Sequence, residues 1–479
     1  MILRVINHPY EFDMKNLCIT FFPHEKIRLE GEEDPVVVTT RRETDGSFFV
    51  SAKVYDVYRE TTAKPEPADE EHLVLSVTLY RLLSGILGFA PPWGVLYGVR
   101  PAKLMHRLCA QMGDDAAVAH FQTAFLTQKS KAELAHEVML HENRSIARSG
   151  PKSFSLYVSI PFCPTRCAYC SFVSHSIEKT HKLMTPYVDL LLRELEETAK
   201  YAKELGLELA TVYFGGGTPT TLSAQDLGRI FSTIEQNFDL SHLMEYTVEA
   251  GRPDTVTRER LEVIQAAGVQ RISINPQSFN DKVLEAIGRR HTAQQTLDAF
   301  ALARDCGFDH INMDFIAGLP EDDLPSFQRS IQTALDLQAE SITVHTLALK
   351  TSAYMVTREQ TFDLKDRLTV SNMVDYAGQT LYGAGYYPYY MYRQSKSLGN
   401  LENVGWCKPG YDCLYNVYMM DETHTVLAVG AGAVTKLRGQ NSGMIERIYN
   451  YKYPYEYIRD FDTLLERKKR IPGFYAEYD

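Results

Sequence analysis

The sequence has 479 residues, of which 44% are hydrophobic and 23% charged, and its formal net charge is −11. This length allows two or three domains, and the acidic balance argues against a protein that tracks nucleic acid along its surface. The chain contains no apolar stretch long enough to span a bilayer, and residues 1–10 lack a signal-peptide pattern. We therefore expect a cytoplasmic protein with neither a membrane span nor a nucleic-acid partner.

The first 150 residues are expected to form an α+β domain. Segments rich in β-branched and aromatic residues predict strands over 2–6, 18–22, 36–40 and 48–54. Apolar residues at helical spacing predict helices over 69–87, 114–127 and 132–147. Gly150-Pro151 ends this domain, and the sequence assigns no role to it.

Residues 151–350 alternate between short apolar strands and helical segments. The strands are predicted over 156–160, 211–214, 246–249, 271–275, 311–315 and 341–344. Parallel strands need a crossover connection, usually a helix, so this order predicts an α/β fold with a parallel sheet. Six units are too few for a closed eight-fold barrel, and we expect a partial (β/α)6 TIM-like barrel that works at the carboxyl ends of its strands. Residues 351–479 are expected to form a C-terminal extension that closes over the barrel.

Three cysteines crowd into the loop that follows the first of these strands. Cys163, Cys167 and Cys170 have the spacing CxxxCxxC. Three thiolates can hold three irons of a [4Fe–4S] cluster and leave the fourth iron open for another ligand. The spacing alone leaves two alternatives, namely three structural cysteines or a zinc site. Structural zinc usually takes four closed ligands, and His175 is the candidate that follows nearby.

A CxxxCxxC motif after the first strand of a six-unit barrel resembles the radical S-adenosyl-L-methionine (SAM) superfamily. The resemblance implies a [4Fe–4S] cluster on Cys163, Cys167 and Cys170, with SAM chelated to the open iron. One electron then breaks the sulfonium bond, and the released 5′-deoxyadenosyl radical abstracts a hydrogen from the substrate. It also implies an electron donor such as flavodoxin or ferredoxin.

Further motifs resemble the family of oxygen-independent coproporphyrinogen III oxidases, also called coproporphyrinogen dehydrogenases. They are YVSIPFC (157–163), GGGTP (215–219), QSFN (277–280) and DFIAGLP (314–320). The flanking segments 93–103 and 393–405 resemble the HemZ-type branch, which carries an additional N-terminal domain. Residue by residue, the resemblance places the SAM and cluster surroundings at Tyr157, Tyr169, Gly216, Gly217, Thr218, Glu249, Gln277, Arg289 and Asp314.

The implied activity is that of a radical SAM oxidoreductase in haem biosynthesis. Two propionate side chains of coproporphyrinogen III would be oxidatively decarboxylated to vinyl groups, giving protoporphyrinogen IX. The substrate carries four carboxylates, so a local basic lining is expected. The candidates are Arg100, Lys103, Arg290 and Arg393, although for each one alone a solvated surface charge is the better interpretation.

One position departs from the family pattern. Well-supported members carry a further cysteine two residues after the third cluster cysteine, near a second SAM, and here that residue is Phe172. Two alternatives therefore stay open: a haem-binding chaperone of the same family, and a radical SAM methyltransferase acting on haem. A chaperone would bind haem through residues such as His345, His424 or the tyrosines within 386–392.

Overall fold

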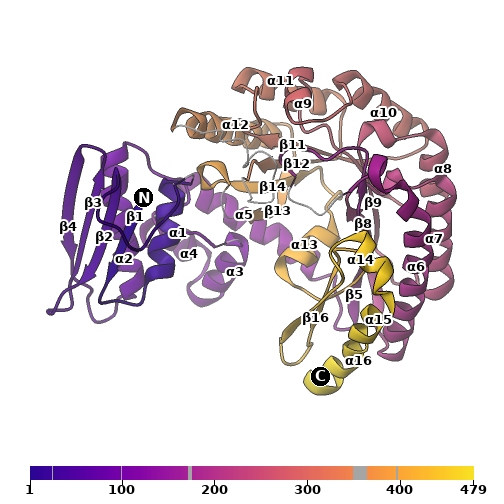
Figure 1. The fold of residues 1–479 in the computed structure, drawn as a ribbon, viewed down its shortest axis with the longest axis horizontal. Coiled ribbons are helices and arrows are strands. Elements are labelled where there is room, and N and C mark those ends of the chain that lie inside the picture. The colour runs from indigo at the N-terminus through magenta and orange to yellow at the C-terminus, as the bar shows by residue number, and fades with distance from the viewer. Residues whose placement is uncertain (24, 99, 171–174, 349–363, 395–396) are drawn as a thin grey trace.

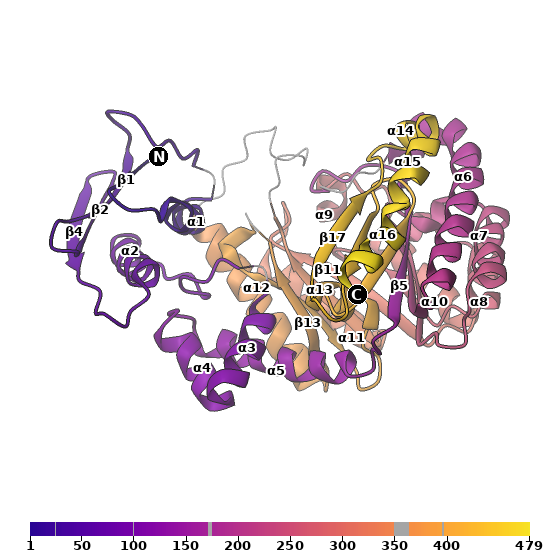
Figure 2. The same cartoon turned by 90° about the horizontal axis from the view of Figure 1, so that it is seen from below.

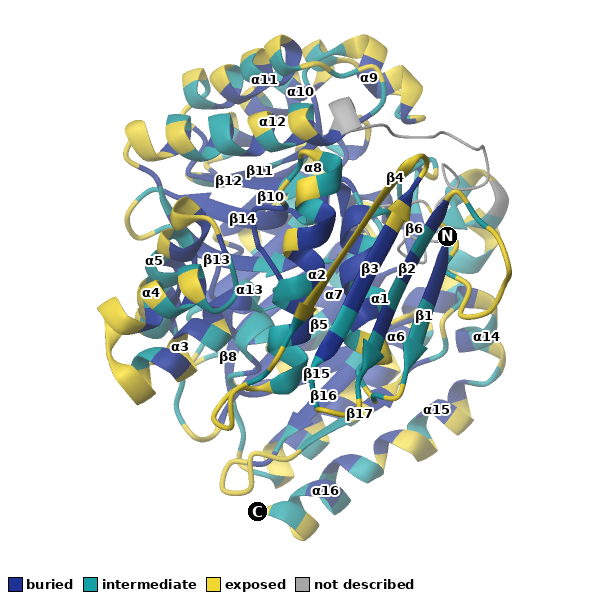
Figure 3. Ribbon diagram, turned by 90° about the vertical axis from the view of Figure 1, so that its left-hand side faces the viewer, coloured by how far each residue is buried: buried dark blue, intermediate teal, exposed yellow. Residues whose placement is uncertain are grey.

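A computed structural model describes the chain except for residues 24, 99, 171–174, 349–363 and 395–396. At the N-terminus, a four-stranded sheet has the order β1 (Ile2–Ile6), β2 (Val36–Arg42), β3 (Phe48–Val54) and β4 (Val57–Ala63). Helices α1 (Glu11–Phe21) and α2 (Glu71–Leu87) share a core with this sheet. Figure 3 shows that β4 is the exposed edge, whereas β3 is largely buried.

The strand predicted over 18–22 is wrong, because these residues end helix α1. Met14, Leu17, Cys18 and Phe21 are its buried apolar residues, and they recur at helical spacing. The β-branched and aromatic residues at the end of the helix favoured a strand locally. Packing of the apolar face against the N-terminal core overrides this local preference and favours a helix.

Three helices connect the N-terminal sheet to the barrel: α3 (Pro101–Met112), α4 (Asp114–Thr123) and α5 (Lys129–Ile146). The two flanking segments noted in the sequence pack against each other at this connection. Trp93 is fully buried, and its Nε1 donates to Glu402 Oε2 at 2.7 Å. The Arg393 guanidinium lies 5.1 Å from the centre of the Trp93 ring, and Lys131 Nζ donates to Glu402 Oε1 at 2.6 Å. These contacts fix the N-terminal region of the chain to the barrel sheet.

The large sheet contains, among the described residues, eleven strands. Its central six are parallel neighbours: β12 (Ser341–Thr346), β11 (His310–Ala317), β10 (Arg271–Ile274), β9 (Glu245–Gly251), β8 (Glu208–Gly216) and β5 (Ser153–Ile160). Helices α6 (Ile177–Glu204), α7 (Ala224–Asn237), α8 (Arg258–Ala266), α10 (Ala293–Asp305) and α11 (Leu324–Asp336) line the outside of this curved sheet, with the short α9 (Asp281–Ala286) at one end (Figure 1). The predicted α/β class and the partial six-unit barrel are confirmed.

Residues after 363 extend this sheet on both sides. Strands β14 (Glu402–Cys407) and β13 (Tyr387–Arg393) join antiparallel beside β12, after helix α12 (Leu364–Gly383). On the other side, β15 (Thr425–Val429) pairs parallel with β5 and is followed by antiparallel β16 (Val434–Arg438) and β17 (Ile445–Tyr449). Helix α13 (Leu414–Asp421) lies between β14 and β15 in the chain. Domain boundaries at 150/151 and 350/351, and closure of the extension over the barrel, stay predictions.

The last helices, α14 (Pro454–Arg459), α15 (Phe461–Lys468) and α16 (Arg470–Tyr478), lie beside α6 and β17 (Figure 2). A buried network, here called the C-terminal clamp, joins α6 to this region. Glu194 on α6 accepts hydrogen bonds from Gly430 N at 2.8 Å, Asn450 Nδ2 at 2.7 Å, Tyr457 Oη at 2.6 Å and Lys468 Nζ at 2.6 Å. The Glu194 and Lys468 side chains are both 0% exposed.

Among the helices that the structure describes, we find none with the length and apolar character required to cross a membrane.

Candidate functional site

The three clustered cysteines lie on the loop at the carboxyl end of β5. The loop begins with β6 (Phe162–Cys163), which pairs parallel with β7 (His175–Ser176). Farther along, Ala168 N donates to Ile287 O at 2.9 Å and Cys170 N donates to Cys167 O at 3.1 Å. Cys167 is buried, and Cys163 and Cys170 are half-buried. The loop is thus held to the barrel on both sides, with Cys163 and Cys170 partly exposed and Cys167 covered.

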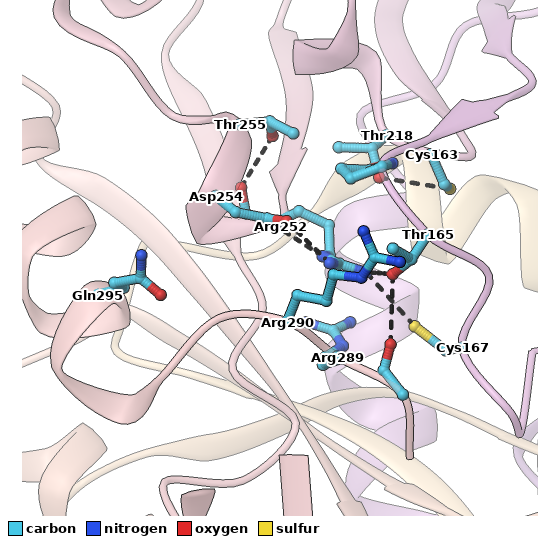
Figure 4. Close-up of polar contacts among 12 residues, drawn as sticks. Cys163, Thr165, Cys167, Thr218, Arg252, Asp254, Thr255, Arg289, Arg290 and Gln295 are labelled. Carbon is cyan, nitrogen blue, oxygen red and sulfur yellow. Dashed lines mark hydrogen bonds and ion pairs between the residues drawn. The ribbon is translucent and has the colours of Figure 1, made fainter. Parts of the chain in front are cut away.

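Hydrogen-bond donors from two other barrel strands reach the sulfurs. Thr218 Oγ1, after β8, lies 3.5 Å from Cys163 Sγ. Arg252 Nη1, after β9, lies 3.7 Å from Cys167 Sγ (Figure 4). Thiolates that ligate iron accept such hydrogen bonds, so the donor set around the loop fits an iron–sulfur cluster.

Arg252 was not singled out by the sequence analysis. It is 3% exposed and forms a bidentate ion pair with Asp254. The signal that was available in the sequence is a charged residue directly before Pro253, three residues after the strand predicted over 246–249. That signal is weak, since most arginines at such positions are solvated.

The glycine triplet packs against the segment that carries Cys163. Gly217 N donates to Ile160 O at 2.7 Å, and Thr218 N donates to Phe162 O at 2.7 Å. A Cβ atom on Gly217 would lie 2.5 Å from Phe162 O, a distance that no side chain tolerates. Gly216 has φ 102°, which favours glycine. The glycines therefore bring the end of β8 against the loop that carries Cys163, Cys167 and Cys170, here called the cluster loop. Their contact with SAM stays a prediction.

Two carboxylates lie on strands β9 and β11, which flank β10 in the barrel sheet. Glu249 on β9 accepts from Tyr213 Oη at 2.6 Å, and burial raises the pKa of Glu249 to about 7. Burial would also raise the pKa of Asp314 on β11, but His345 and Asn312 outweigh it and the pKa lies below its usual value. Asn312 Nδ2 donates to Asp314 Oδ1 at 2.7 Å, and His345 Nε2 lies 3.9 Å from Asp314 Oδ2. These groups can accept hydrogen bonds from amine or hydroxyl groups of a ligand.

Arg289 meets the cluster loop at Tyr169. Its Nη1 donates to Asn275 O at 2.6 Å and its Nη2 donates to Tyr169 Oη at 3.2 Å. Arg289 Nε is buried without a hydrogen-bond partner in the described part of the chain, and the same holds for Asn275 Oδ1. This incompletely paired guanidinium can bind a carboxylate.

The other two predicted SAM-site residues have defined structural roles. Gln277 adopts φ 67°, accepts from Ile316 N at 3.2 Å and donates its own N–H to Asp314 O at 2.9 Å, which couples β10 to β11. Tyr157 stacks with Tyr213 and Tyr415, at ring-centre distances of 6.3 and 5.9 Å. The structure therefore brings Tyr169 and Arg289 to the cysteines, whereas Tyr157 packs in a tyrosine stack that also holds the partner of Glu249.

The four basic residues predicted to line the substrate site all pair with other groups of the protein. Arg100 and Lys103 both pair with Glu422, and Arg290 pairs with Glu178 at 2.6 Å. Arg393 is buried, which lowers its pKa to about 9, and donates to backbone carbonyl groups of Leu96 and Asn400.

The candidate haem ligands are also engaged. His424 lies between Ser149 and Ser155, with burial lowering its pKa to about 3. The tyrosines of β13 include Tyr389 and Tyr390, which are buried. Tyr392 Oη lies 3.2 Å from His345 Nδ1, on the side of the barrel that carries Asp314. Phe172, where the family pattern has a cysteine, lies outside the described residues.

Comparison with known proteins places this arrangement in a family. Residues 157–334 match the model of the Radical SAM superfamily. The chain is 34% identical over 470 residues to the oxygen-independent coproporphyrinogen-III oxidase-like protein HemZ of Bacillus subtilis, covering 95% of this chain and 94% of that protein. The chain belongs to the HemZ-type branch of the radical SAM superfamily. Its cofactors are those of the superfamily, a [4Fe–4S] cluster and SAM.

More distant relatives of this HemZ-type protein include the heme chaperone HemW of Escherichia coli. That protein is 31% identical over 300 residues, covering 63% of this chain and 74% of HemW. Among solved structures, coproporphyrinogen III oxidase (HemN) of Escherichia coli matches with a TM-score of 0.51 and 22% identity. The match covers 68% of this chain and 72% of that chain. It shows a shared fold.

Proposed function

We propose that the protein binds its [4Fe–4S] cluster through Cys163, Cys167 and Cys170 and oxidatively decarboxylates two propionates of coproporphyrinogen III to give protoporphyrinogen IX. The observation that carries this proposal is the cluster loop at the barrel end, with its donors to sulfur, in a chain similar to HemZ along 95% of its length. The similarity to HemN supports the same fold around that loop.

The cluster supplies the electron that cleaves bound SAM into a radical able to abstract hydrogen. The protein side chains would bind and orient SAM. Arg289, with its unpaired Nε, is suited to the SAM carboxylate, while Gly216, Gly217 and Thr218 offer backbone polar groups beside Cys163. Glu249, Gln277 and Asp314 offer acceptors for the amine and hydroxyl groups of SAM. Tyr157 and Tyr169 line the barrel next to these groups and help exclude water.

We also propose that the protein works in the cytoplasm with an electron donor such as flavodoxin or ferredoxin. The reaction needs one electron for each SAM that is cleaved. Each propionate then loses one hydrogen atom to the 5′-deoxyadenosyl radical, carbon dioxide, and one electron that passes to a separate electron acceptor. Half-buried Cys163 and Cys170 support access for such a donor, because the loop that carries them lies at the end of the barrel.

The deciding experiment is an anaerobic assay of cluster-reconstituted protein with SAM, a reductant and coproporphyrinogen III. Chromatography of the oxidised porphyrins and of the adenosyl products follows. Protoporphyrin with about two 5′-deoxyadenosines per molecule supports the proposed reaction, because each propionate needs one radical. SAM cleavage without protoporphyrin contradicts the substrate assignment and leaves the radical SAM chemistry in place.

The second candidate is haem binding, as in the heme chaperones HemW to which the chain is similar. Phe172 in place of the additional cysteine favours this candidate over two-SAM chemistry. A haem titration of the same protein tests it, with His345→Ala as the variant, because His345 and Tyr392 lie together beside Asp314. Release of S-adenosylhomocysteine instead of 5′-deoxyadenosine would indicate the third alternative, a haem methyltransferase.

A further inference from the structure

Arg252 is a buried cation whose hydrogen bonds divide between an acid and the cluster loop. Asp254 receives two parallel hydrogen bonds, from Nε to Oδ1 at 2.9 Å and from Nη2 to Oδ2 at 2.9 Å. This pair fixes the plane of the guanidinium. Nη1 remains for the loop, where it donates to Thr165 Oγ1 at 3.2 Å and to Cys167 Sγ at 3.7 Å (Figure 4).

The main chain of Arg252 is fixed as well. It stands directly before the short helix η2 (Pro253–Thr255). Thr255 donates to Arg252 O twice, from its backbone N at 2.9 Å and from its Oγ1 at 2.8 Å. Thr255 Oγ1 also lies 2.6 Å from Thr220 Oγ1, after the glycine triplet. The guanidinium is therefore aimed at Cys167 by two strands of the barrel and does not reach it as a mobile side chain.

Two of the three motif cysteines receive donors of different charge. Cys163 receives the neutral hydroxyl of Thr218, whereas Cys167 receives a guanidinium. Asp254 would suffice to pair the charge of Arg252, so the contact with Cys167 is not needed for burial of the arginine. Hydrogen bonds to the sulfurs of an iron–sulfur cluster, and its net charge environment, tune the reduction potential. Both the N–H donor and the positive charge favour the additional electron of the reduced cluster.

We propose that Arg252 is a positioning residue that holds the Cys167 thiolate and raises the reduction potential of the cluster, with Asp254 fixing its guanidinium. This role rests on the proposed ligation of the cluster by Cys167. A higher potential makes the reduction that precedes SAM cleavage easier. The role also explains the Arg252–Asp254 ion pair, which lies outside the set of predicted SAM-binding residues.

The test is a redox titration of anaerobically reconstituted protein without SAM, followed by electron paramagnetic resonance, together with iron content. Arg252→Met removes the donor and keeps an apolar stem. We expect the equilibrium constant for one-electron reduction to fall about tenfold, which is about 59 mV toward lower potential. Asp254→Asn keeps Arg252 but weakens the bidentate pair, so we expect a smaller shift in the same direction.

Arg258→Met is a matched control. Arg258 Nη1 also lies 3.7 Å from a cysteine sulfur, that of Cys306, but Cys306 is outside the cluster motif. We expect the wild-type potential for this control. An unchanged potential in both Arg252→Met and Asp254→Asn would overturn the proposal. If Arg252→Met retains no iron, the same redox titration is made on Asp254→Asn and Arg252→Lys. Lysine keeps the positive charge but lacks the forked guanidinium donors. Retention of iron by Cys167→Ala would instead contradict the proposed cluster ligation.

Discussion

Two buried polar sites adjoin the end of strand β5, and they differ in how completely their charged groups are paired. In the C-terminal clamp, both oxygens of Glu194 accept two hydrogen bonds each. Lys468 Nζ also donates to Ala428 O at 2.8 Å and lies 3.3 Å from Thr198 Oγ1. At the cluster loop, by contrast, Arg289 Nε and Asn275 Oδ1 have no partner within the described ranges.

This difference suggests different roles for the two sites: the clamp stabilises the fold, whereas the cluster loop is expected to bind a ligand. Buried polar groups in proteins are nearly all hydrogen-bonded, so an unpaired one calls for an explanation such as an absent ligand. Asn450 Oδ1 in the clamp is likewise unpaired among the described residues, but the charged groups there, the Glu194 carboxylate and the Lys468 ammonium, are fully engaged, and removal of Lys468 leaves a buried charge. We therefore expect substitutions in the clamp to lower the free energy of unfolding and substitutions at the loop to remove chemistry.

Cys167→Ala should have the largest effect on function. Without one of three thiolate ligands, the cluster is lost, and with it the iron–sulfur absorbance and all SAM cleavage. The free energy of unfolding of the iron-free protein should change by no more than about 1 kcal/mol, because a small side chain is shortened by one atom. Iron content, SAM cleavage and chemical denaturation measure the two effects separately. Cys306→Ala, outside the motif, should retain the cluster; if it did not, the loss in Cys167→Ala would have no site-specific meaning.

Lys468→Met should have the largest effect on stability. It leaves Glu194 as an unpaired buried charge, and breaking a buried pair in this way typically lowers the free energy of unfolding by about 3–5 kcal/mol. The neighbouring Lys469 is 62% exposed and pairs with Glu466. Lys469→Met should leave the free energy of unfolding nearly unchanged, because surface ion pairs contribute little to stability. Equal effects of the two substitutions, measured by denaturant unfolding, would contradict the role of the clamp.

Gly430→Ala tests the clamp through the backbone. Gly430 has φ 93°, and a Cβ atom there would lie 2.5 Å from both Ser159 O and Tyr187 Oη. We expect a loss of about 2 kcal/mol or more, from the combined strain and overpacking. Gly432 also has a positive φ, 76°, but its Cβ would meet nothing closer than Lys452 O at 3.7 Å. Gly432→Ala should therefore lower stability by only about 1 kcal/mol. Thermal unfolding of the two variants gives the difference.

The sequence was sufficient for the features that depend on short-range pattern. Strands and helices alternate regularly between residues 151 and 350, so the parallel partial barrel could be predicted from periodicity. Cys163, Cys167 and Cys170 lie within eight residues of one another, so a shared site could be predicted from their spacing, although the spacing alone did not choose between a cluster and zinc. Where pattern and packing disagreed, as at Cys18 and Phe21, the local preference for a strand was overruled by the buried face of a helix.

The features that depend on contacts between distant residues could not be predicted. Glu194 and Lys468 are ordinary charged residues in amphipathic helices, and only the fold brings them together. Arg252 reaches Cys167 from another strand, and Arg393 binds the backbone near Trp93 although its charge suggested a substrate ligand. Charged residues are usually solvated, so a sequence offers no means of selecting the few that are buried.

Glu249→Gln should have the smallest effect on stability, and this effect should appear only in how stability depends on pH. Burial raises the pKa of Glu249 to about 7 in the folded protein, above the ordinary value of 4.5. Between these values the folded state binds more protons than the unfolded chain, so the contribution of Glu249 to stability is lost as pH rises toward 7. Glutamine does not ionise and its amide oxygen can still accept from Tyr213.

The melting temperatures of wild type and Glu249→Gln should therefore diverge as pH rises from 5 to 8, with the variant becoming relatively more stable. We expect the difference in free energy of unfolding between the two proteins to grow by about 1–2 kcal/mol over this range, after allowance for partial exposure of the carboxylate. Parallel pH profiles for the two proteins would show that Glu249 ionises normally. A divergence that SAM reduces would place the Glu249 carboxylate among the groups that bind ligand at the cluster loop, since a ligand that prefers the ionised form stabilises it.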